Sequence, residues 1–338
     1  MFDVTVCGAG PIGSYIAWKF STRGYKTLLI EEHKKPGLPL SCSGLVSTRL
    51  WNFIPKKSFL IERKILGARI HIFNNTYTFN SKQSVLIDRT KLDQYLFSLA
   101  ESSGAKYLFK THLNGFFEKK DDVSLYTSSP SESHFQTKIL AGCDGPLSTV
   151  RSFLNISNPN FLQAMFCYTN ETPDSYVDLY FKETPDFFAW RIPRFNTVEY
   201  GLASKSHAKY YFKKFIKKHK IKPKKIFSGL IPFGLLQKTT SSRVFLCGDA
   251  ASQTKPYTGG GIVYGLTCAD IASSTIDPDN PDLYLYEKIW RKKLSKQIVL
   301  GTLIKRSYRL PAPFLDFTLN LLLKKQNLDM DMPSTIFR

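Results

Sequence analysis

The fold is decided by residues 2–13, which read FDVTVCGAGPIG. Residues 2–7 form an apolar run that predicts a short strand, and residues 11–22 carry apolar side chains at the spacing of an amphipathic helix. Gly8 and Gly10 lie between these two segments, and Gly13 lies in the first turn of the predicted helix. A second apolar run, Thr27–Ile30, ends at Glu31, 23 residues after Gly8. This order of strand, glycine-rich turn, helix, strand and acid is typical of a βαβ unit that binds a dinucleotide.

Each glycine of this turn has its own physical reason. Gly8 permits the tight turn, Gly10 lets the backbone approach a pyrophosphate, and Gly13 lets the helix pack close to the sheet. The pyrophosphate is expected at the helix N-terminus, where free amides and the helix dipole favour an anion. Glu31 is expected to accept hydrogen bonds from the adenosine ribose hydroxyls. The alternative reading is a glycine-rich turn without a ligand.

Three later segments repeat the pattern of a buried strand that runs into a turn. Val85–Arg89 leads into a helix, Ile139–Gly145 ends a strand with Asp-Gly, and Arg243–Ala251 ends one with Gly-Asp. Lys255–Ile262 then forms a glycine-rich turn before a further helix. We expect these segments to belong to the same cofactor domain as the first unit.

Other segments have the two-residue period of half-buried strands. They are residues 68–73, 164–168, 176–182, 187–193 and 197–203. They predict an antiparallel sheet inserted into a Rossmann-type domain, so the expected fold class is α/β, or α+β overall. The predicted domains are residues 1–60, 84–158 and 238–278 for the cofactor, 61–83 and 159–237 for the inserted sheet, and 279–338 for a short C-terminal helical region.

The charge of the chain is uneven. The 338 residues include 47 Lys and Arg against 27 Asp and Glu, a formal net charge of +20. Ten lysines lie in residues 205–226 and eight Lys or Arg in residues 288–309, and neither segment contains an acid. No base-reading module accompanies them, so nucleic acid is not an expected partner. We expect Lys209–Lys225 and Lys288–Arg309 to contact an anionic membrane or an acidic electron-donor protein.

The cysteines and histidines show no metal-binding spacing. Six cysteines are spread singly, the six histidines form neither HxxxH nor HExxH, and no apolar run approaches the ~18 residues of a membrane-spanning helix. We therefore expect no metal and no disulfide framework. The predicted location is the cytoplasm, with peripheral contact at the inner face of the cell membrane.

The motifs together resemble FAD-dependent enzymes of the hydroxybenzoate-hydroxylase-like fold. Three further segments resemble the geranylgeranyl reductase family, in particular its archaeal members that act on digeranylgeranylglycerophospholipids. Pro36–Gly44 resembles the family's loop with a cysteine two residues before a glycine, and Phe188–Pro193 resembles its aromatic-x-Trp-x-x-Pro segment. Lys255–Ile262 is similar to the family's Lys-Pro-x-Thr-Gly-Gly-Gly-Ile. The resemblance covers residues 1 to about 275, and the C-terminal region matches weakly.

This resemblance implies FAD as cofactor and saturation of C=C bonds in geranylgeranyl chains of archaeal-type ether phospholipids by hydride transfer from reduced flavin. The implied electron donor is NADPH or ferredoxin. The residues implied to bind FAD are Gly8, Gly10, Pro11, Ile12, Gly13, Glu31, Arg89, Leu113, Asp144, Gly248, Asp249, Gly260, Gly261 and Ile262. Among them, Arg89 would reach phosphate or ribose, Asp249 the ribitol hydroxyls, and Leu113 the adenine. Asp144 is expected to shape the turn near the cofactor.

Four residues are candidates for contact with substrate. Cys42 lies in a Ser/Gly/Pro-rich loop, whereas the other cysteines lie in apolar segments typical of inert core thiols. Cys42, Tyr257 or a water could supply the proton that accompanies the hydride. Phe188 and Trp190 are expected either in the sheet core or on the wall of an apolar substrate tunnel.

Two other functions remain open from the sequence. A flavin monooxygenase of the same fold usually carries a Gly-Gln-Gly-like turn after Gly-Asp, whereas this chain has Gly259-Gly260-Gly261. A flavin electron-transfer protein without an organic substrate is the third possibility. Glu32 and Ser252 also depart from the residues common in the reductase family.

Overall fold

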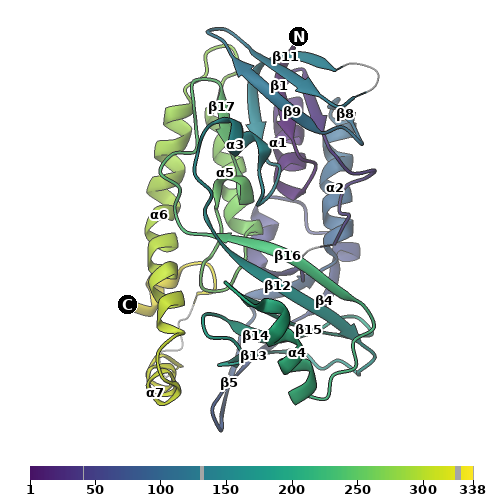
Figure 1. Ribbon diagram of the computed structural model, residues 1–338. Helices are drawn as coiled ribbons and strands as arrows, with labels where there is room; N and C mark the ends of the chain where they lie inside the picture. The colour runs from purple at the N-terminus through teal and green to yellow at the C-terminus, as the bar shows by residue number, and fades with distance from the viewer. Residues whose placement is uncertain (41, 130–132, 324–328, 338) are drawn as a thin grey trace.

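The computed structural model describes residues 1–40, 42–129, 133–323 and 329–337. Figure 1 shows two large sheets, one toward each end of the molecule, with helix α6 (Leu283–Ser307) running along one side. The mixed α/β class expected from the sequence is confirmed.

The first sheet contains the N-terminal strand. Its order is β8-β2-β1-β11-β10-β9, and β17 pairs with β11. The pairs β8–β2, β2–β1, β1–β11 and β11–β17 are parallel, while β9 and β10 are antiparallel additions. The strands are β1 (Phe2–Cys7), β2 (Thr27–Ile30), β8 (Lys106–Leu108), β9 (Leu113–Glu118), β10 (Val123–Thr127), β11 (His134–Gly142) and β17 (Val244–Leu246).

Helices pack on this sheet and complete its core. The largest apolar cluster joins β1 to helices α1 (Pro11–Thr22), α2 (Arg89–Ser102), α5 (Ile262–Thr275) and α6. A second cluster covers the other face and includes Val150 of the short helix α3 (Thr149–Phe153). The predicted strand–turn–helix segments are therefore confirmed. Each of them forms a strand, in this sheet or in a smaller third sheet described below, and a helix follows that strand.

The second sheet has the order β16-β12-β15-β14-β13-β5-β6. Its strands are β5 (Gly67–Ile72), β6 (Asn75–Asn80), β12 (Asn160–Thr169), β13 (Tyr176–Phe181), β14 (Phe188–Pro193), β15 (Val198–Ser204) and β16 (Ile226–Phe233). One pair departs from the antiparallel expectation, because β13 and β5 run parallel. Helix α4 (Ala208–Lys218) covers one face, where Phe212 and Phe215 are buried among residues of β12 and β15.

A small third sheet was not predicted. It has the order β3-β7-β4, with strands β3 (Leu45–Ser47), β4 (Ile61–Lys64) and β7 (Ser84–Ile87). Short 3-10 helices flank it at Thr48–Asn52 and Ser58–Leu60, and another follows β17 at Gly248–Ala251. The domain boundaries proposed from the sequence stay a prediction.

The C-terminal region is helical, with α6 followed by α7 (Ala312–Leu323) and a 3-10 helix at Pro333–Phe337. Residues 324–328 and 338 of the predicted region 279–338 lie outside the described residues. None of the helices in the described ranges combines the length and the apolar composition needed to cross a bilayer. No cluster of His, Cys, Asp and Glu suited to a metal ion occurs among the described residues.

Candidate active site

A cavity of about 900 Å³ joins the first sheet to the second. This volume lies at the upper end of the range of ligand sites, about 300–1,000 Å³. The turns after β1, β2 and β11 line one half, and side chains of the second sheet line the other. Ligands of parallel α/β sheets bind at these carboxyl ends of the strands.

The glycine-rich turn is fixed by backbone contacts. The Gly8 amide donates to the Ile30 carbonyl at 2.8 Å, and the Ala9 amide donates to Glu31 Oε2 at 2.7 Å. Gly8 has φ +100°, and a Cβ there would lie 2.5 Å from the Cys143 carbonyl oxygen. A Cβ on Gly13 would lie 1.9 Å from the Gly8 carbonyl oxygen. Gly13 therefore leaves no room for a side chain, and the closest contact is with the turn itself rather than with a strand of the sheet.

The same turn leaves an anion site open toward the cavity. Gly10 is the N-cap of α1, Pro11 follows it, and no side chain caps the first turn of the helix. A Cβ on Gly10 would meet no atom within 4 Å, and Gly10 lines the cavity. The free amides of this helix end fit the pyrophosphate of a dinucleotide.

Arg89 supplies a cation beside this turn. Its Nη2 donates to both oxygens of Asp93 at 2.9 Å, and its buried Nε has no hydrogen-bond partner in the structure. Burial opposes its charge, but the Asp93 carboxylate outweighs this and raises the pKa of Arg89. The Arg89 side chain lines the cavity, and its guanidinium charge fits a phosphate or ribose oxygen.

The second glycine-rich turn also lines the cavity. Gly261 is the N-cap of α5 and has no side-chain cap, and Gly260, Gly261 and Ile262 line the cavity. Asp249 lines it as well, and burial raises the pKa of Asp249 to about 6 while the Arg89 charge acts in the opposite direction. A carboxylate with this environment fits hydroxyl donors, and the helix end fits negative charge on a reduced flavin.

Two other predicted cofactor residues also reach the cavity. Asp144 accepts from the Ser148 hydroxyl at 2.5 Å and from the Val150 amide at 3.0 Å, so its carboxylate caps α3 and holds the turn. Burial raises the pKa of Asp144 against these hydrogen bonds. Leu113 is the first residue of β9 and lines the cavity beside Thr111 and His112.

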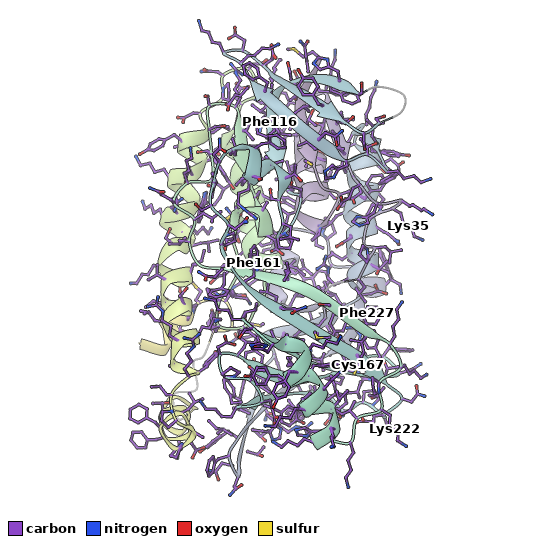
Figure 2. The ribbon with its side chains drawn as sticks, in the orientation of Figure 1. Lys35, Phe116, Phe161, Cys167, Lys222 and Phe227 are labelled. Carbon is purple, nitrogen blue, oxygen red and sulfur yellow. The ribbon has the colours of Figure 1, made fainter. Side chains whose placement is uncertain are left out.

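Cys42 lies on the cavity wall. Its Sγ accepts from the Gly44 amide at 3.5 Å, and it faces the Arg89 guanidinium. Cys42 is partly exposed, whereas the other five cysteines are buried. Figure 2 labels one of these, Cys167, which lies on β12 in the apolar cluster under α4.

The half of the cavity formed by the second sheet is apolar. Phe188 and Trp190 of β14 line it, and both also belong to the apolar core of that sheet. The two roles that the sequence left open are therefore compatible. The other apolar side chains on this wall include Val177, Leu179, Phe187, Ile192, Leu230 and Ile231.

Tyr257 does not line the cavity, where a residue that donates a proton to the substrate must lie. It is 7% exposed, its hydroxyl donates to the Met330 carbonyl at 2.7 Å, and it is absent from the described residues that line the cavity. Burial raises its pKa far above that of a free tyrosine. The expectation of a direct role is corrected on these grounds. Gly13 and Gly248 likewise shape the turns without lining the cavity.

The sequence interpretation missed many residues of the cavity lining, and Met330 is the one described residue among them that comes from the C-terminal segment. The segment around Met330 lies against Lys255 and Tyr257. No local motif marks this residue, because its contacts join positions more than 70 residues apart in the chain.

Comparisons with known proteins agree with this geometry. Residues 58–210 match the family of FAD binding domains. The chain is similar to the digeranylgeranylglycerophospholipid reductase of Methanocaldococcus jannaschii, with 28% identity over 326 residues, 87% of this chain and 83% of the relative.

Two solved structures share the fold. A geranylgeranyl bacteriochlorophyll reductase-like protein of Thermoplasma acidophilum superposes with a TM-score of 0.87 and 22% identity, covering 99% of this chain and 94% of the other. The p-nitrophenol 4-monooxygenase of Pseudomonas putida has a TM-score of 0.79 at 14% identity, covering 98% and 95%. The cofactor of the chain is FAD, and most of its sequence is similar to digeranylgeranylglycerophospholipid reductases.

Proposed function

We propose that the protein is an FAD-dependent reductase that saturates C=C bonds in geranylgeranyl chains of archaeal-type ether phospholipids. The observation that carries this proposal is a single continuous cavity, which is lined by a dinucleotide-type turn, by an apolar wall and by Cys42. An isoprenoid chain offers only apolar surface, so an apolar wall suits it. The relatives named for this reaction support the same conclusion.

In this proposal the chain binds and orients the cofactor, and reduced FAD supplies the hydride. The amides at the start of α1 and the Arg89 guanidinium hold the pyrophosphate. Glu31 accepts from the adenosine ribose, Leu113 lies by the adenine, and Asp249 accepts from the ribitol. The backbone amides of Gly260 and Gly261 stabilise negative charge on the flavin ring.

Cys42 is the proposed proton donor to the alkene carbon that does not receive the hydride. Among the described cysteines on the cavity wall, it is the one that is not buried. Phe188 and Trp190 hold the isoprenoid chain of the substrate against Cys42 and exclude bulk water. An ordered water is the alternative donor.

Mass spectrometry of geranylgeranyl phospholipids incubated with dithionite-reduced protein tests the activity. The expected result is the addition of two hydrogens for each bond saturated. NADPH oxidation coupled to oxygen uptake with an aromatic substrate would instead indicate a monooxygenase. Tight FAD binding with no saturation of any prenyl lipid would indicate an electron-transfer protein. Anaerobic turnover with NADPH or with reduced ferredoxin identifies the electron donor.

We also propose that the lysines of α4 and the following loop bring the enzyme to an anionic membrane surface. All nine lysines from Lys209 to Lys225 are exposed, and Lys222 is labelled at the lower edge of Figure 2. The apolar face of α4 is buried against the second sheet, so the proposed contact is electrostatic rather than insertion. Each lysine near such a surface contributes about 1 kcal/mol.

Sedimentation with anionic and with neutral vesicles tests this contact. Binding to anionic vesicles that falls with salt is expected, and substitution of Lys209, Lys213 and Lys217 by glutamate should abolish it. Negligible binding to both vesicle types contradicts the membrane contact and favours an acidic donor protein at this surface. Most bases of the segment Lys288–Arg309 are exposed as well, although Lys305 is buried over the Phe233 ring.

A further inference from the structure

Arg194 connects three separate parts of the chain at the end of β14. It is 8% exposed and follows the strand that carries Trp190. Its Nε and Nη2 donate to the two oxygens of Glu62 on β4 at 2.9 and 2.5 Å. Its Nη1 donates to Glu199 Oε2 at 3.0 Å and to the Ser43 carbonyl at 2.6 Å.

Both ends of this network reach the cavity. Ser43 is the neighbour of Cys42 in the chain, and both line the cavity. At the other end, Glu199 Oε1 accepts from Trp190 Nε1 at 2.9 Å, and the Trp190 ring lies against Gly201, where a Cβ would come within 2.4 Å of it. The indole of the apolar wall and the backbone of the cysteine loop are therefore linked through two charged side chains.

We propose that Arg194 is a positioning residue that holds the Cys42 loop in register with the Trp190 wall, so that the thiol is presented to the substrate double bond. The proposal rests on the proposed function, which makes Cys42 the proton donor. Arg194 is not among the described residues that line the cavity, so it acts through Ser43 rather than by contact with substrate.

The network needs an arginine and a buried acid. Glu199 is 0% exposed, and a buried carboxylate is stable only when it is paired and hydrogen-bonded. The planar guanidinium donates in several fixed directions and can serve Glu62, Glu199 and Ser43 together, whereas a lysine ammonium is a point charge on a flexible stem. Because the guanidinium donors of Arg194 point in fixed directions, the Cys42 loop is held at a fixed position relative to the Trp190 wall.

Thiol labelling tests the proposal without any turnover. Iodoacetamide labelling of FAD-loaded protein, followed by mass spectrometry, reports the exposure of Cys42, since the other five cysteines are buried. Arg194→Lys keeps the charge but loses the fork, so the labelling rate of Cys42 is expected to rise about tenfold, the scale of one charge-assisted hydrogen bond. Arg191→Lys is the matched control, because Arg191 lies on the same strand and pairs with Asp174 and Asp178 instead.

Glu62→Gln is the second variant and serves if Arg194→Lys fails to fold. Glu62 is the partly exposed partner of Arg194, and its loss should also speed labelling while the thermal midpoint and FAD absorbance stay near those of the wild type. Labelling rates equal to those of the wild type in the folded variants overturn the proposal. This outcome is independent of reductase activity, so it is distinguishable from failure of the proposed function.

A double-mutant cycle then tests whether Arg194 acts through Cys42. On a geranylgeranyl phospholipid, Arg194→Lys is expected to lower kcat more than it raises KM. Arg194→Lys combined with Cys42→Ala should be no slower than Cys42→Ala alone. Additive losses would mean that Arg194 acts by another route and would overturn the proposal.

Discussion

The Lys255 ammonium and the Asp331 carboxylate form an ion pair at 2.8 Å, with side chains only 5% and 4% exposed. They lie 76 residues apart, in the turn before Gly260 and in the C-terminal segment. The Tyr264 hydroxyl donates to the Asp331 carbonyl at 2.6 Å, and Arg49 pairs with Asp329 nearby. These contacts tie the C-terminal segment to the wall of the cavity.

Asp331→Asn is expected to destabilise the fold by about 3–5 kcal/mol, because it leaves the Lys255 ammonium buried without its counter-ion. Chemical denaturation measures this loss. Replacing both partners, Lys255→Met with Asp331→Leu, should recover most of it, since two apolar groups leave no buried charge. The FAD affinity of Asp331→Asn should also fall, because the pair supports the turn that carries Gly260.

The matched control is Lys91→Met. Lys91 pairs with Asp88 at 3.6 Å and its side chain is 56% exposed, so its loss should change stability by less than about 1 kcal/mol. Equal effects of Asp331→Asn and Lys91→Met would contradict the structural role of the buried pair.

Gly10→Ala and Gly13→Ala should separate cofactor binding from folding. Gly10 has φ −68°, which alanine adopts, and a Cβ there meets no protein atom, so stability should fall by less than about 1 kcal/mol. The same Cβ enters the space proposed for the pyrophosphate, and FAD affinity should fall about tenfold or more, at least about 1.4 kcal/mol. Gly13→Ala should lower both the stability of the fold and the FAD affinity, because its Cβ clashes with the Gly8 carbonyl oxygen.

Fluorescence titration with FAD and thermal denaturation check this pair of variants. Full FAD affinity in a folded Gly10→Ala protein would show that the pyrophosphate does not approach this turn.

The sequence predicted the first βαβ unit well because its signals are local. The strand, the glycines, the helix and Glu31 all lie within 31 residues, and the Ala9 amide bonds the predicted acid directly. The strand β7 was predicted, but β3 and β4 are only three and four residues long and were not. The third sheet therefore escaped prediction, since its pairing joins distant segments.

The network around Arg194 was missed for a related reason. Arg194 and Glu62 lie 132 residues apart, and no spacing rule connects them. One signal was present in the sequence: Glu199 is an acid in a run that otherwise reads as a buried strand. A buried acid requires a partner, so this position could have been marked, although the identity of the partner depends on the fold.

FAD affinity should depend on pH through Asp249. Burial raises the pKa of this carboxyl to about 6, and in the proposed function the ribitol hydroxyls donate to its ionised form. Bound FAD then favours the deprotonated carboxylate, so affinity should be nearly level above about pH 7 and weaken as the pH falls through 6, by up to about tenfold per unit.

Equilibrium titrations from pH 5 to pH 8 measure this dependence. Asp249→Asn should bind FAD more weakly than the wild type at pH 8 and should lack the slope. A wild-type affinity that is constant over this range, or a slope that persists in Asp249→Asn, would contradict the assignment of the ribitol to this residue.

Cys42→Ala should lower the rate of double-bond saturation about a hundredfold or more, the usual contribution of a positioned general acid. The measurement is a single turnover of dithionite-reduced protein, so the measured rate does not depend on which natural electron donor the protein uses. FAD affinity should stay close to that of the wild type, because the FAD contacts proposed for the chain do not involve this side chain. Cys268→Ala is the control, since Cys268 is a buried residue of α5 outside the described lining of the cavity.

Cys42→Ser tests whether the side chain at position 42 is the acid, because a hydroxyl at the same position is a weaker acid of similar size. An intermediate rate is expected if the side chain at position 42 transfers the proton itself. A Cys42→Ala protein that saturates the lipid at the wild-type rate would assign the proton to water. The Arg194 network would then hold a loop that shapes the cavity without supplying the acid.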